Sequence, residues 1–306
     1  MTDVRTLPLV LGTAQLGLAY GIANRSGRPD AEAAAAIVRE AWEGGIREFD
    51  TAQAYGASET VLGEAFRRLG IAGRAEVVTK FDPALDPLDA AAMIGSVERS
   101  LERLGVERLE GVMLHREEML AQWDRGLGTI ASRLVSSGKV RRIGVSVYSP
   151  DKAIEALGTE GVDMVQVPTS IVDGRFEEAG VFALARERGK RVYVRSVFLQ
   201  GLLLMNVDEL PPALAGARPV IERLEEIARE RGLSRRELAL AAVKGAAPEA
   251  RIVFGAETAA QVRENLESWE RCPALGPGPW RMELRARVDE RLLNPARWPS
   301  SATRRG

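Results

Sequence analysis

Cysteine and histidine are almost absent from this chain of 306 residues, which contains one cysteine, Cys272, and one histidine, His115. A single cysteine excludes an internal disulfide framework and a cysteine-rich zinc site. A second nitrogen ligand for a metal is also missing, and the thiol is remote from His115 in the sequence. The sequence therefore predicts neither disulfide cross-links nor a metal centre.

An excess of charge and long apolar runs are lacking too. Lysine and arginine number 42 against 43 aspartates and glutamates, so the formal net charge is -1. A near-neutral chain lacks the excess of positive charge that attracts nucleic acid or acidic membrane surfaces. No stretch approaches the roughly 18 uninterrupted apolar residues of a membrane span, and the first residues, MTDVRTLPLVLG, lack the apolar core of a secretory signal. We therefore expect a cytoplasmic protein with no nucleic-acid or membrane partner.

What the chain does contain is a repeated alternation of short apolar segments and helical segments. Met93, Val97, Leu101 and Leu104, for example, recur at helical spacing on one face. The strand candidates are residues 9–11, 46–49, 75–79, 109–114, 140–145, 162–167, 192–194 and 251–254. Eight strand–helix repeats in one chain predict an α/β fold, the (β/α)8 or TIM barrel. Its strands are apolar because helices cover one face and barrel packing covers the other.

An open, doubly wound sheet is the alternative α/β architecture, and it usually carries a glycine fingerprint at its first turn. Here that turn reads GTAQLG from residue 12, which is not GxGxxG. No domain boundary is evident, so we expect a single domain over residues 1–306. A tail after about residue 272, with an extra helical segment at residues 282–293, is expected to pack on the barrel.

Four polar side chains follow three consecutive strand candidates. Asp50 and Tyr55 lie after the second strand, Lys80 ends the third and His115 ends the fourth. Each has an ordinary structural explanation: a turn carboxylate, a surface phenol, a solvated charge, a structural histidine. Because the carboxyl ends of barrel strands converge on one face, their joint placement predicts an active site.

These side chains suit proton transfer to a carbonyl oxygen. A free tyrosine, with a pKa of about 10, is a poor acid near neutrality. A nearby lysine ammonium favours the phenolate and is expected to lower the pKa of Tyr55. Asp50 would hold Lys80 charged and in place, and a neutral His115 could orient the substrate oxygen. A Schiff-base isomerase or aldolase using Lys80 is the alternative from the same fold, but the three neighbouring polar groups count against it.

The motifs FDTAQAYG, VVTK and VMLHR resemble those of the aldo-keto reductase superfamily, and the resemblance covers nearly the whole chain. The segments LGTAQLGLAYGI and RSVFLQGLLLM resemble a bacterial branch of that superfamily. The resemblance implies an NADPH-dependent oxidoreductase acting on aldehydes or ketones, with a small-molecule carbonyl substrate. Tyr55 would donate the proton, Asp50 and Lys80 would tune the acidity of Tyr55, and His115 would orient the carbonyl. The family is often monomeric, so a monomer is expected. A non-catalytic NADP(H)-binding regulatory subunit of the same fold is the alternative.

The same resemblance implies cofactor contacts from five parts of the chain. The residues are Gly12, Thr13, Ser146, Gln166, Arg195, Ser196, Phe198, Gly201, Gly255, Thr258, Gln261 and Asn265. The segment at 198–201 would cover the pyrophosphate, and the segment at 255–265 would hold the adenosine and its phosphate near a helix N-terminus. Thr258 and Gln261 also fit a helix capping box, which is the structural alternative for them.

Four positions depart from the family pattern. Val147 stands where asparagine is common, and Arg195 stands where an aromatic ring usually stacks on the nicotinamide. Selectivity for NADPH often depends on a basic side chain near the adenosine phosphate, but this chain has Glu257 and Gln261 there. NADPH is the expected cofactor, with NADH not excluded.

Overall fold

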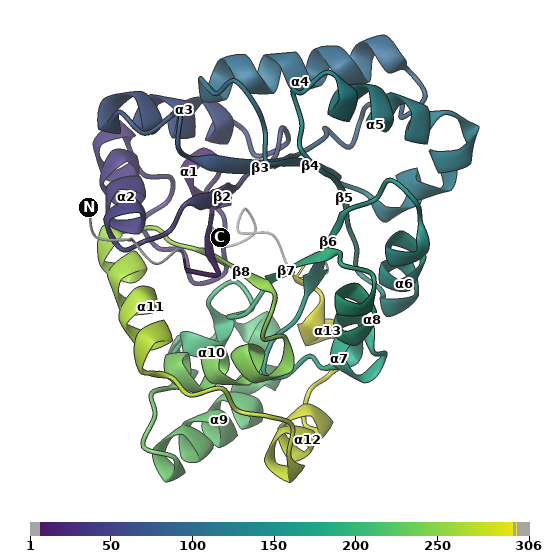
Figure 1. The fold of residues 1–306 in the computed structure, drawn as a ribbon. Coiled ribbons are helices and arrows are strands. Elements are labelled where there is room, and N and C mark those ends of the chain that lie inside the picture. Colours follow the sequence, from purple (N-terminus) through teal and green to yellow (C-terminus); the bar gives the residue numbers. More distant parts are fainter. Residues whose placement is uncertain (1–6, 296–297, 299–306) are drawn as a thin grey trace.

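The computed structural model describes residues 7–295 and residue 298. Eight parallel strands pair in sequence order, and β8 pairs with β1 to close the barrel (Figure 1). The strands are β1 (Leu9–Gly12), β2 (Glu48–Asp50), β3 (Glu76–Lys80), β4 (Gly111–Leu114), β5 (Ile143–Ser146), β6 (Met164–Pro168), β7 (Arg191–Arg195) and β8 (Arg251–Gly255). The predicted barrel is confirmed, and each strand lies within two or three residues of its predicted position.

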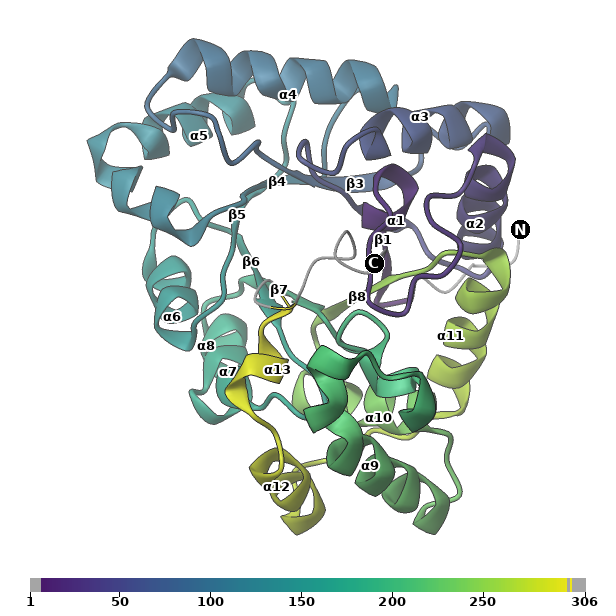
Figure 2. The same cartoon turned by 180° about the vertical axis from the view of Figure 1, so that it is seen from behind.

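Helices form the outer layer around this ring, as the opposite views in Figures 1 and 2 show. The α-helices are α1 (Ala14–Gly17), α2 (Ala31–Glu43), α3 (Ser58–Leu69), α4 (Ala90–Leu104), α5 (Leu127–Ser136), α6 (Pro150–Gly158), α7 (Arg175–Glu178), α8 (Val181–Glu187), α9 (Arg218–Glu230), α10 (Arg235–Ala246), α11 (Ala259–Arg271), α12 (Pro279–Ala286) and α13 (Glu290–Leu293). Short 3-10 helices are η1 (Glu117–Arg125), η2 (Leu202–Leu204), η3 (Val207–Glu209) and η4 (Pro212–Ala217). None of the helices in the described residues combines the length and apolar character that a membrane span requires.

Helix α4 illustrates how the sequence sets these elements. The Asp89 side chain accepts a hydrogen bond from the Ala92 N–H at 2.9 Å and so caps the first turn. Met93 and Val97 are buried on the face toward the barrel. Gly105 ends the helix with a φ of 66°, in the left-handed region that glycine adopts without a steric penalty.

The barrel has two apolar cores. Alternate strand residues point inward and pack together: Val10, Val78, Met113, Met164, Tyr193 and Val253. Their neighbours along the strands point outward and pack under the helices, Val77 and Val112 among them. Both faces of each strand are therefore buried, which explains why the strand sequences are short and apolar.

Charged residues gather at the amino ends of several strands. Glu48 begins β2, and Glu110 immediately precedes β4; both carboxylates are almost fully buried. Arg191 at the start of β7 donates to Glu110 at 2.9 Å, and the hydroxyl of Tyr193 donates to Glu48. Arg251, at the start of β8, lies 3.3 Å from Glu48. This ionic cluster occupies the barrel end opposite the strand C-termini.

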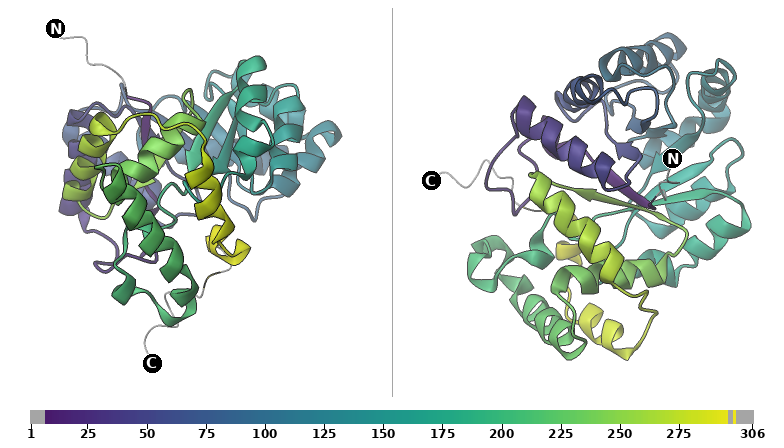
Figure 3. Two further views of the ribbon diagram at one scale, coloured as in Figure 1. Left: turned by 90° about the horizontal axis from the view of Figure 1, so that it is seen from below. Right: turned by 60° about the vertical axis from the view of Figure 1, so that its left-hand side comes forward.

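The structure differs locally from the predicted elements. The outer layer is interrupted between α7 and α8, where Gly180 adopts a left-handed φ of 73°. The one-turn helix α1 lies directly after β1, in the glycine-rich turn that starts at residue 12. The tail forms two helices, with α12 beside α9 (Figure 3), and the buried Arg281 of α12 pairs with Glu177 of α7 at 3.0 Å.

Candidate active site

The carboxyl ends of the strands surround a cavity of about 410 Å³. Asp50 ends β2, His115 follows β4, and Tyr55 lies on the loop after β2; all three line the cavity. Lys80 ends β3 but is buried behind Asp50 and does not line the cavity. The four predicted residues therefore come together, with Lys80 one layer deeper than the others.

Lys80 and Asp50 form a closely bonded ion pair. The Nζ of Lys80 lies 2.7 Å from both carboxylate oxygens of Asp50 and 3.0 Å from the Thr51 carbonyl oxygen. The Nε2 of Gln166, on β6, donates to the same carboxylate at 2.7 Å. The three N–H donors of Lys80 are therefore occupied, and its ammonium does not line the cavity. A substrate carbonyl could not readily reach Nζ to form a Schiff base, so the geometry disfavours the aldolase alternative.

The phenol of Tyr55 lies against the other two groups. Its ring centroid is 5.2 Å from the Nζ of Lys80 and 5.8 Å from the centroid of the His115 ring, which it meets edge to face. Burial and then the Asp50 carboxylate raise the pKa of Tyr55. The expected lowering by Lys80 is therefore wrong for this state, because the Asp50 carboxylate neutralises the ammonium and the ring is desolvated. Tyr55 is a protonated phenol at neutral pH.

His115 is held neutral. Burial, followed by the Lys80 ammonium, lowers the pKa of His115 to about 4. At neutral pH its imidazole carries one N–H donor and one acceptor nitrogen. The neutral ring and the protonated phenol beside it each carry one hydrogen-bond donor at this end of the cavity.

Two glycines set the position of the Tyr55 loop. A Cβ on Gly17, in α1, would lie 1.8 Å from the Tyr55 carbonyl oxygen. Gly56 has a φ of 58°, and a Cβ there would lie 2.8 Å from the Gly17 carbonyl oxygen. The Ser58 hydroxyl donates to the Thr13 carbonyl at 2.7 Å and ties the loop to the end of β1. Close backbone contact between these two loops thus fixes where Tyr55 enters the cavity.

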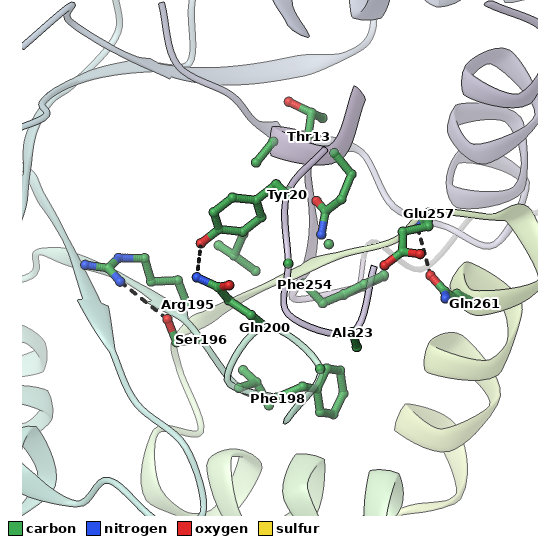
Figure 4. A pocket seen from close by; sticks show the side chains of 18 of the residues that line it. Thr13, Tyr20, Ala23, Arg195, Ser196, Phe198, Gln200, Phe254, Glu257 and Gln261 are labelled. Carbon is green, nitrogen blue, oxygen red and sulfur yellow. Dashed lines mark hydrogen bonds between the residues drawn. The ribbon is translucent and has the colours of Figure 1, made fainter. Parts of the chain in front are cut away.

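The segment after β7 is strained and borders the same cavity. Ser196, Leu199 and Gln200 have φ values of 66°, 46° and 54°, which non-glycine residues rarely adopt. Figure 4 shows the Gln200 side chain meeting the Tyr20 hydroxyl across the pocket, where Nε2 donates at 3.1 Å. Such strain is usually kept where a loop must present its backbone to a ligand.

The far end of the cavity is formed around the N-terminus of α11. Gly255, Gln261 and Asn265 line the cavity there, but Thr258 does not. Thr258 caps the helix by accepting from the Gln261 N–H at 3.2 Å. The Oε1 of Gln261 in turn accepts from the Glu257 N–H at 2.7 Å. Thr258 is therefore a capping residue, as its structural alternative predicts, and the other three border the cavity.

The sequence profile described as the Aldo/keto reductase family matches residues 8–274. The chain belongs to this family. Among its relatives, an NADH-specific methylglyoxal reductase of Escherichia coli K12 is 29% identical in an alignment of length 304 that covers 87% of this chain and 90% of that protein. A soybean (Glycine max) protein assigned to the aldo-keto reductases is 30% identical in an alignment of length 205 that covers 62% of this chain and 58% of that protein, so the match spans little more than half of that relative. A solved structure from Pseudomonas aeruginosa, assigned to the same family, is 25% identical, has a TM-score of 0.61, and covers 87% of this chain and 92% of that one.

The aldo/keto reductase cavity fits an elongated nicotinamide cofactor. It extends from Asp50 and Tyr55 to the N-terminal end of α11, where backbone N–H groups favour a phosphate. Between these ends lies the strained loop of residues 196–201. All twelve predicted cofactor residues except Thr258 line the cavity.

Several residues of the cavity wall were not predicted from the sequence. Arg236 is the second residue of α10, and its guanidinium donates to Asn265 Oδ1 at 2.6 Å and to Glu264 at 2.7 Å. Tyr148 also lines the cavity, and Gln200 does so within the predicted segment of residues 198–201. Gly17 supports Tyr55 without lining the cavity. The density of glycines in residues 12–21 was a signal for Gly17 alone; Arg236 belongs to an ordinary capped helix start.

Proposed function

We propose that this protein is a carbonyl reductase, which transfers a hydride between a nicotinamide cofactor and an aldehyde or ketone. One observation carries the proposal: a protonated phenol and a neutral imidazole share one cavity with the Asp50–Lys80 ion pair behind them. This arrangement supplies a general acid and a second hydrogen-bond donor, and it contains no activated nucleophile.

The bound dihydronicotinamide would supply the hydride. The carbonyl π electrons move to oxygen, and that oxygen takes the phenolic proton of Tyr55, so the products are an alcohol and the oxidised cofactor. An alkoxide is a stronger base than a phenolate, which makes the transfer favourable even though burial raises the pKa of Tyr55. The Lys80 ammonium, 5.2 Å from the centre of the ring, would offset the charge of Asp50 beside the phenolate left behind, and solvent would return the proton. His115 donates its N–H to the same oxygen and orients the carbonyl.

The cofactor would be held by the residues that line the cavity. Ser146 and Gln166 would bind the nicotinamide carboxamide, the loop of residues 196–201 the pyrophosphate, and Asn265 with the start of α11 the adenosine portion. NADPH remains the prediction from the sequence, and the NADH specificity of the Escherichia coli relative makes NADH the second cofactor to test. A cytoplasmic monomer also remains a prediction.

Replacing Tyr55 with phenylalanine tests the proposed acid. We expect Tyr55→Phe to lower kcat for aldehyde reduction by about 10²–10⁴-fold, the usual contribution of a general acid. Cofactor affinity, measured by quenching of tryptophan fluorescence, should stay within about threefold, because the change removes one oxygen. The assay follows the loss of dihydronicotinamide absorbance with a panel of small aldehydes and ketones.

Tyr20→Phe is the matched control, since Tyr20 lines the same cavity and its hydroxyl accepts a hydrogen bond from Gln200. It should retain most of the activity. Equal turnover in Tyr55→Phe and the unaltered protein would exclude Tyr55 as the acid. Cofactor binding without turnover of any carbonyl would favour the non-catalytic regulatory subunit instead.

A further inference from the structure

Arg195 is a cation at the reacting end of the cavity. It is the last residue of β7, it is half-buried, and it lines the cavity with Tyr55 and His115. Burial dominates the pKa of both Tyr55 and His115, and the charge of Arg195 is a further cause acting on each. The guanidinium therefore lies within electrostatic range of the groups proposed to act on the carbonyl.

Arg195 has no carboxylate partner. Within the described residues, its side chain makes only two hydrogen bonds, to the Ser196 hydroxyl and the Val147 carbonyl oxygen, both at 3.4 Å. Its guanidinium stacks on the ring of Tyr148, with Cζ 4.4 Å from the ring centroid. A guanidinium has five N–H donors in a planar fork, so these two long contacts leave an edge free to bind an anion.

The other arginines of the cavity wall differ from Arg195. Arg25 pairs with Glu209 at 2.9 Å, and Arg236 pairs with Glu264 at 2.7 Å. A partly buried cation without a counter-ion is costly unless an anion joins it. The contrast indicates that the missing anion of Arg195 arrives with a ligand.

The position of Arg195 points to the substrate as the source of that anion. In Figure 4 its guanidinium lies at the opposite side of the pocket from Glu257 and Gln261, which mark the predicted adenosine end. Tyr148, on which it stacks, follows β5 and is 43% exposed at the cavity mouth. The pyrophosphate of a cofactor would instead lie between these two ends, beside the loop of residues 196–201.

We propose that Arg195 binds a carboxylate on the carbonyl substrate, so that the preferred substrates are oxo acids rather than neutral aldehydes. This inference rests on the proposed reductase function. One planar guanidinium matches one planar, singly charged carboxylate through two parallel N–H···O bonds. Tyr148 would hold the fork in place, which lowers the entropy lost on binding.

Substrates paired as a carboxylic acid and its methyl ester test this proposal. Glyoxylate and 4-oxobutanoate are compared with their methyl esters, which keep the aldehyde and cover the carboxylate. We expect kcat/KM of the unaltered protein to be at least about tenfold higher for the better acid than for its ester. Arg195→Gln should lower kcat/KM for the acid about 10- to 100-fold. It should change kcat/KM for the ester by no more than about threefold from the value of the unaltered protein. The kcat/KM of Arg195→Lys for the acid should lie between those of the unaltered protein and Arg195→Gln, since lysine keeps the charge and loses the planar fork of donors.

Arg25→Gln is the matched control, because it removes an equal charge from the same cavity wall at a paired site. It should leave the acid-to-ester ratio unchanged. A second readout is the affinity of butanoate, an unreactive carboxylate, for the cofactor-bound protein by calorimetry, which Arg195→Gln should weaken.

Two results would overturn the proposal: equal kcat/KM for acid and ester in the unaltered protein, or an equal loss of both in Arg195→Gln. The second would assign Arg195 to cofactor binding. If the protein reduces neutral aldehydes alone, the proposal for Arg195 fails and the proposed reductase function is retained. If it reduces no carbonyl at all, the proposed reductase function itself fails.

Discussion

Burial controls the protonation of the side chains proposed to act in catalysis. Tyr55 and His115 both remain in their neutral forms, since desolvation raises the pKa of the phenol and lowers the pKa of the imidazole. The ammonium of Lys80 is buried as well, but Asp50 contacts it with both oxygens. The charges of Lys80 and Asp50 are therefore held together in one ion pair beneath the reacting groups.

His115 should titrate near pH 4 rather than near its unfolded value of about 6.5. Because it is the only histidine in the sequence, an NMR titration of the untagged protein yields a single imidazole curve. A midpoint above 6 would contradict the buried, neutral state.

The same shift links His115 to stability. Its folded pKa is lower than its unfolded pKa, so the unfolded chain takes up the proton first as pH falls. The contribution of His115 is then complete above pH 6.5 and is lost between about 6.5 and 4. Over this window, the unfolding free energy of His115→Gln should fall by on the order of 2–3 kcal/mol less than that of the unaltered protein. Urea denaturation of both proteins at several pH values measures this difference.

Glu257 is expected to weaken selectivity for NADPH. It lines the cavity at the adenosine end, where burial raises its pKa and the Ser26 hydroxyl lies 3.3 Å from Oε2. A carboxylate repels the additional phosphate of NADPH more than the hydroxyl of NADH. Glu257→Gln should therefore raise the NADPH-to-NADH affinity ratio about 3- to 10-fold, measured by calorimetry. Glu102→Gln, on the exposed face of α4, is the control, and an unchanged ratio in Glu257→Gln would show that the carboxylate does not face the phosphate.

At the scale of elements, the short helix α1 supports the Tyr55 loop through backbone contact. No side chain can fit between Gly17 and the Tyr55 carbonyl oxygen, since a Cβ would approach to 1.8 Å. The loop after β2 must therefore move if Gly17 is enlarged. Placement of the acid depends on the packing of two loops as well as on the end of a strand.

Gly17→Ala is expected to lower kcat/KM by about 10- to 100-fold, because a displacement near 1 Å of a catalytic group can cost that much. Steady-state kinetics and the thermal midpoint should both be measured. Gly95→Ala is the control, since it lies in α4 and its Cβ would meet only the flexible end of Arg99 at 3.3 Å. Unchanged kinetics in Gly17→Ala would show that the loop adapts without moving Tyr55.

At the scale of the whole molecule, stability and chemistry lie at opposite ends of the barrel. The strand C-termini hold the cavity, and the strand N-termini hold the buried cluster of Glu48 and Glu110 with their arginines. This division is typical of barrel enzymes. Changes in the ionic cluster should therefore affect folding with little effect on turnover.

Glu110→Ala tests this division. Glu110 accepts from Arg191 at 2.9 Å, lies 3.4 Å from Arg141 and also bonds to Arg142. Its removal leaves three arginines without this shared anion, and we expect a loss of about 3–5 kcal/mol in unfolding free energy. Glu110→Gln should cost less, since it keeps an acceptor. A fall in kcat at temperatures where the variant stays folded would contradict the separation of the two ends.

The sequence by itself determined the barrel and the four residues that meet at the carboxyl end of its strands, three at the cavity and Lys80 beneath them. Alternating apolar and amphipathic segments have periods that depend on local residues, so the strands could be counted and their ends located. Parallel strands in a barrel share one direction, which is why Asp50, Lys80 and His115 could be assigned to the same face. The family motifs added the cofactor positions, eleven of which line the cavity.

Only the tertiary structure decided how these residues behave. The raised pKa of Tyr55 follows from its desolvation and from the charge of Asp50, and neither can be obtained from residue spacing. The close approach of Gly17 to the Tyr55 loop, and an Arg195 that stacks on Tyr148 without a carboxylate, depend on segments far apart in the chain. Periodicity specifies elements because it is local, whereas burial, charge pairing and steric contact arise only when distant segments meet.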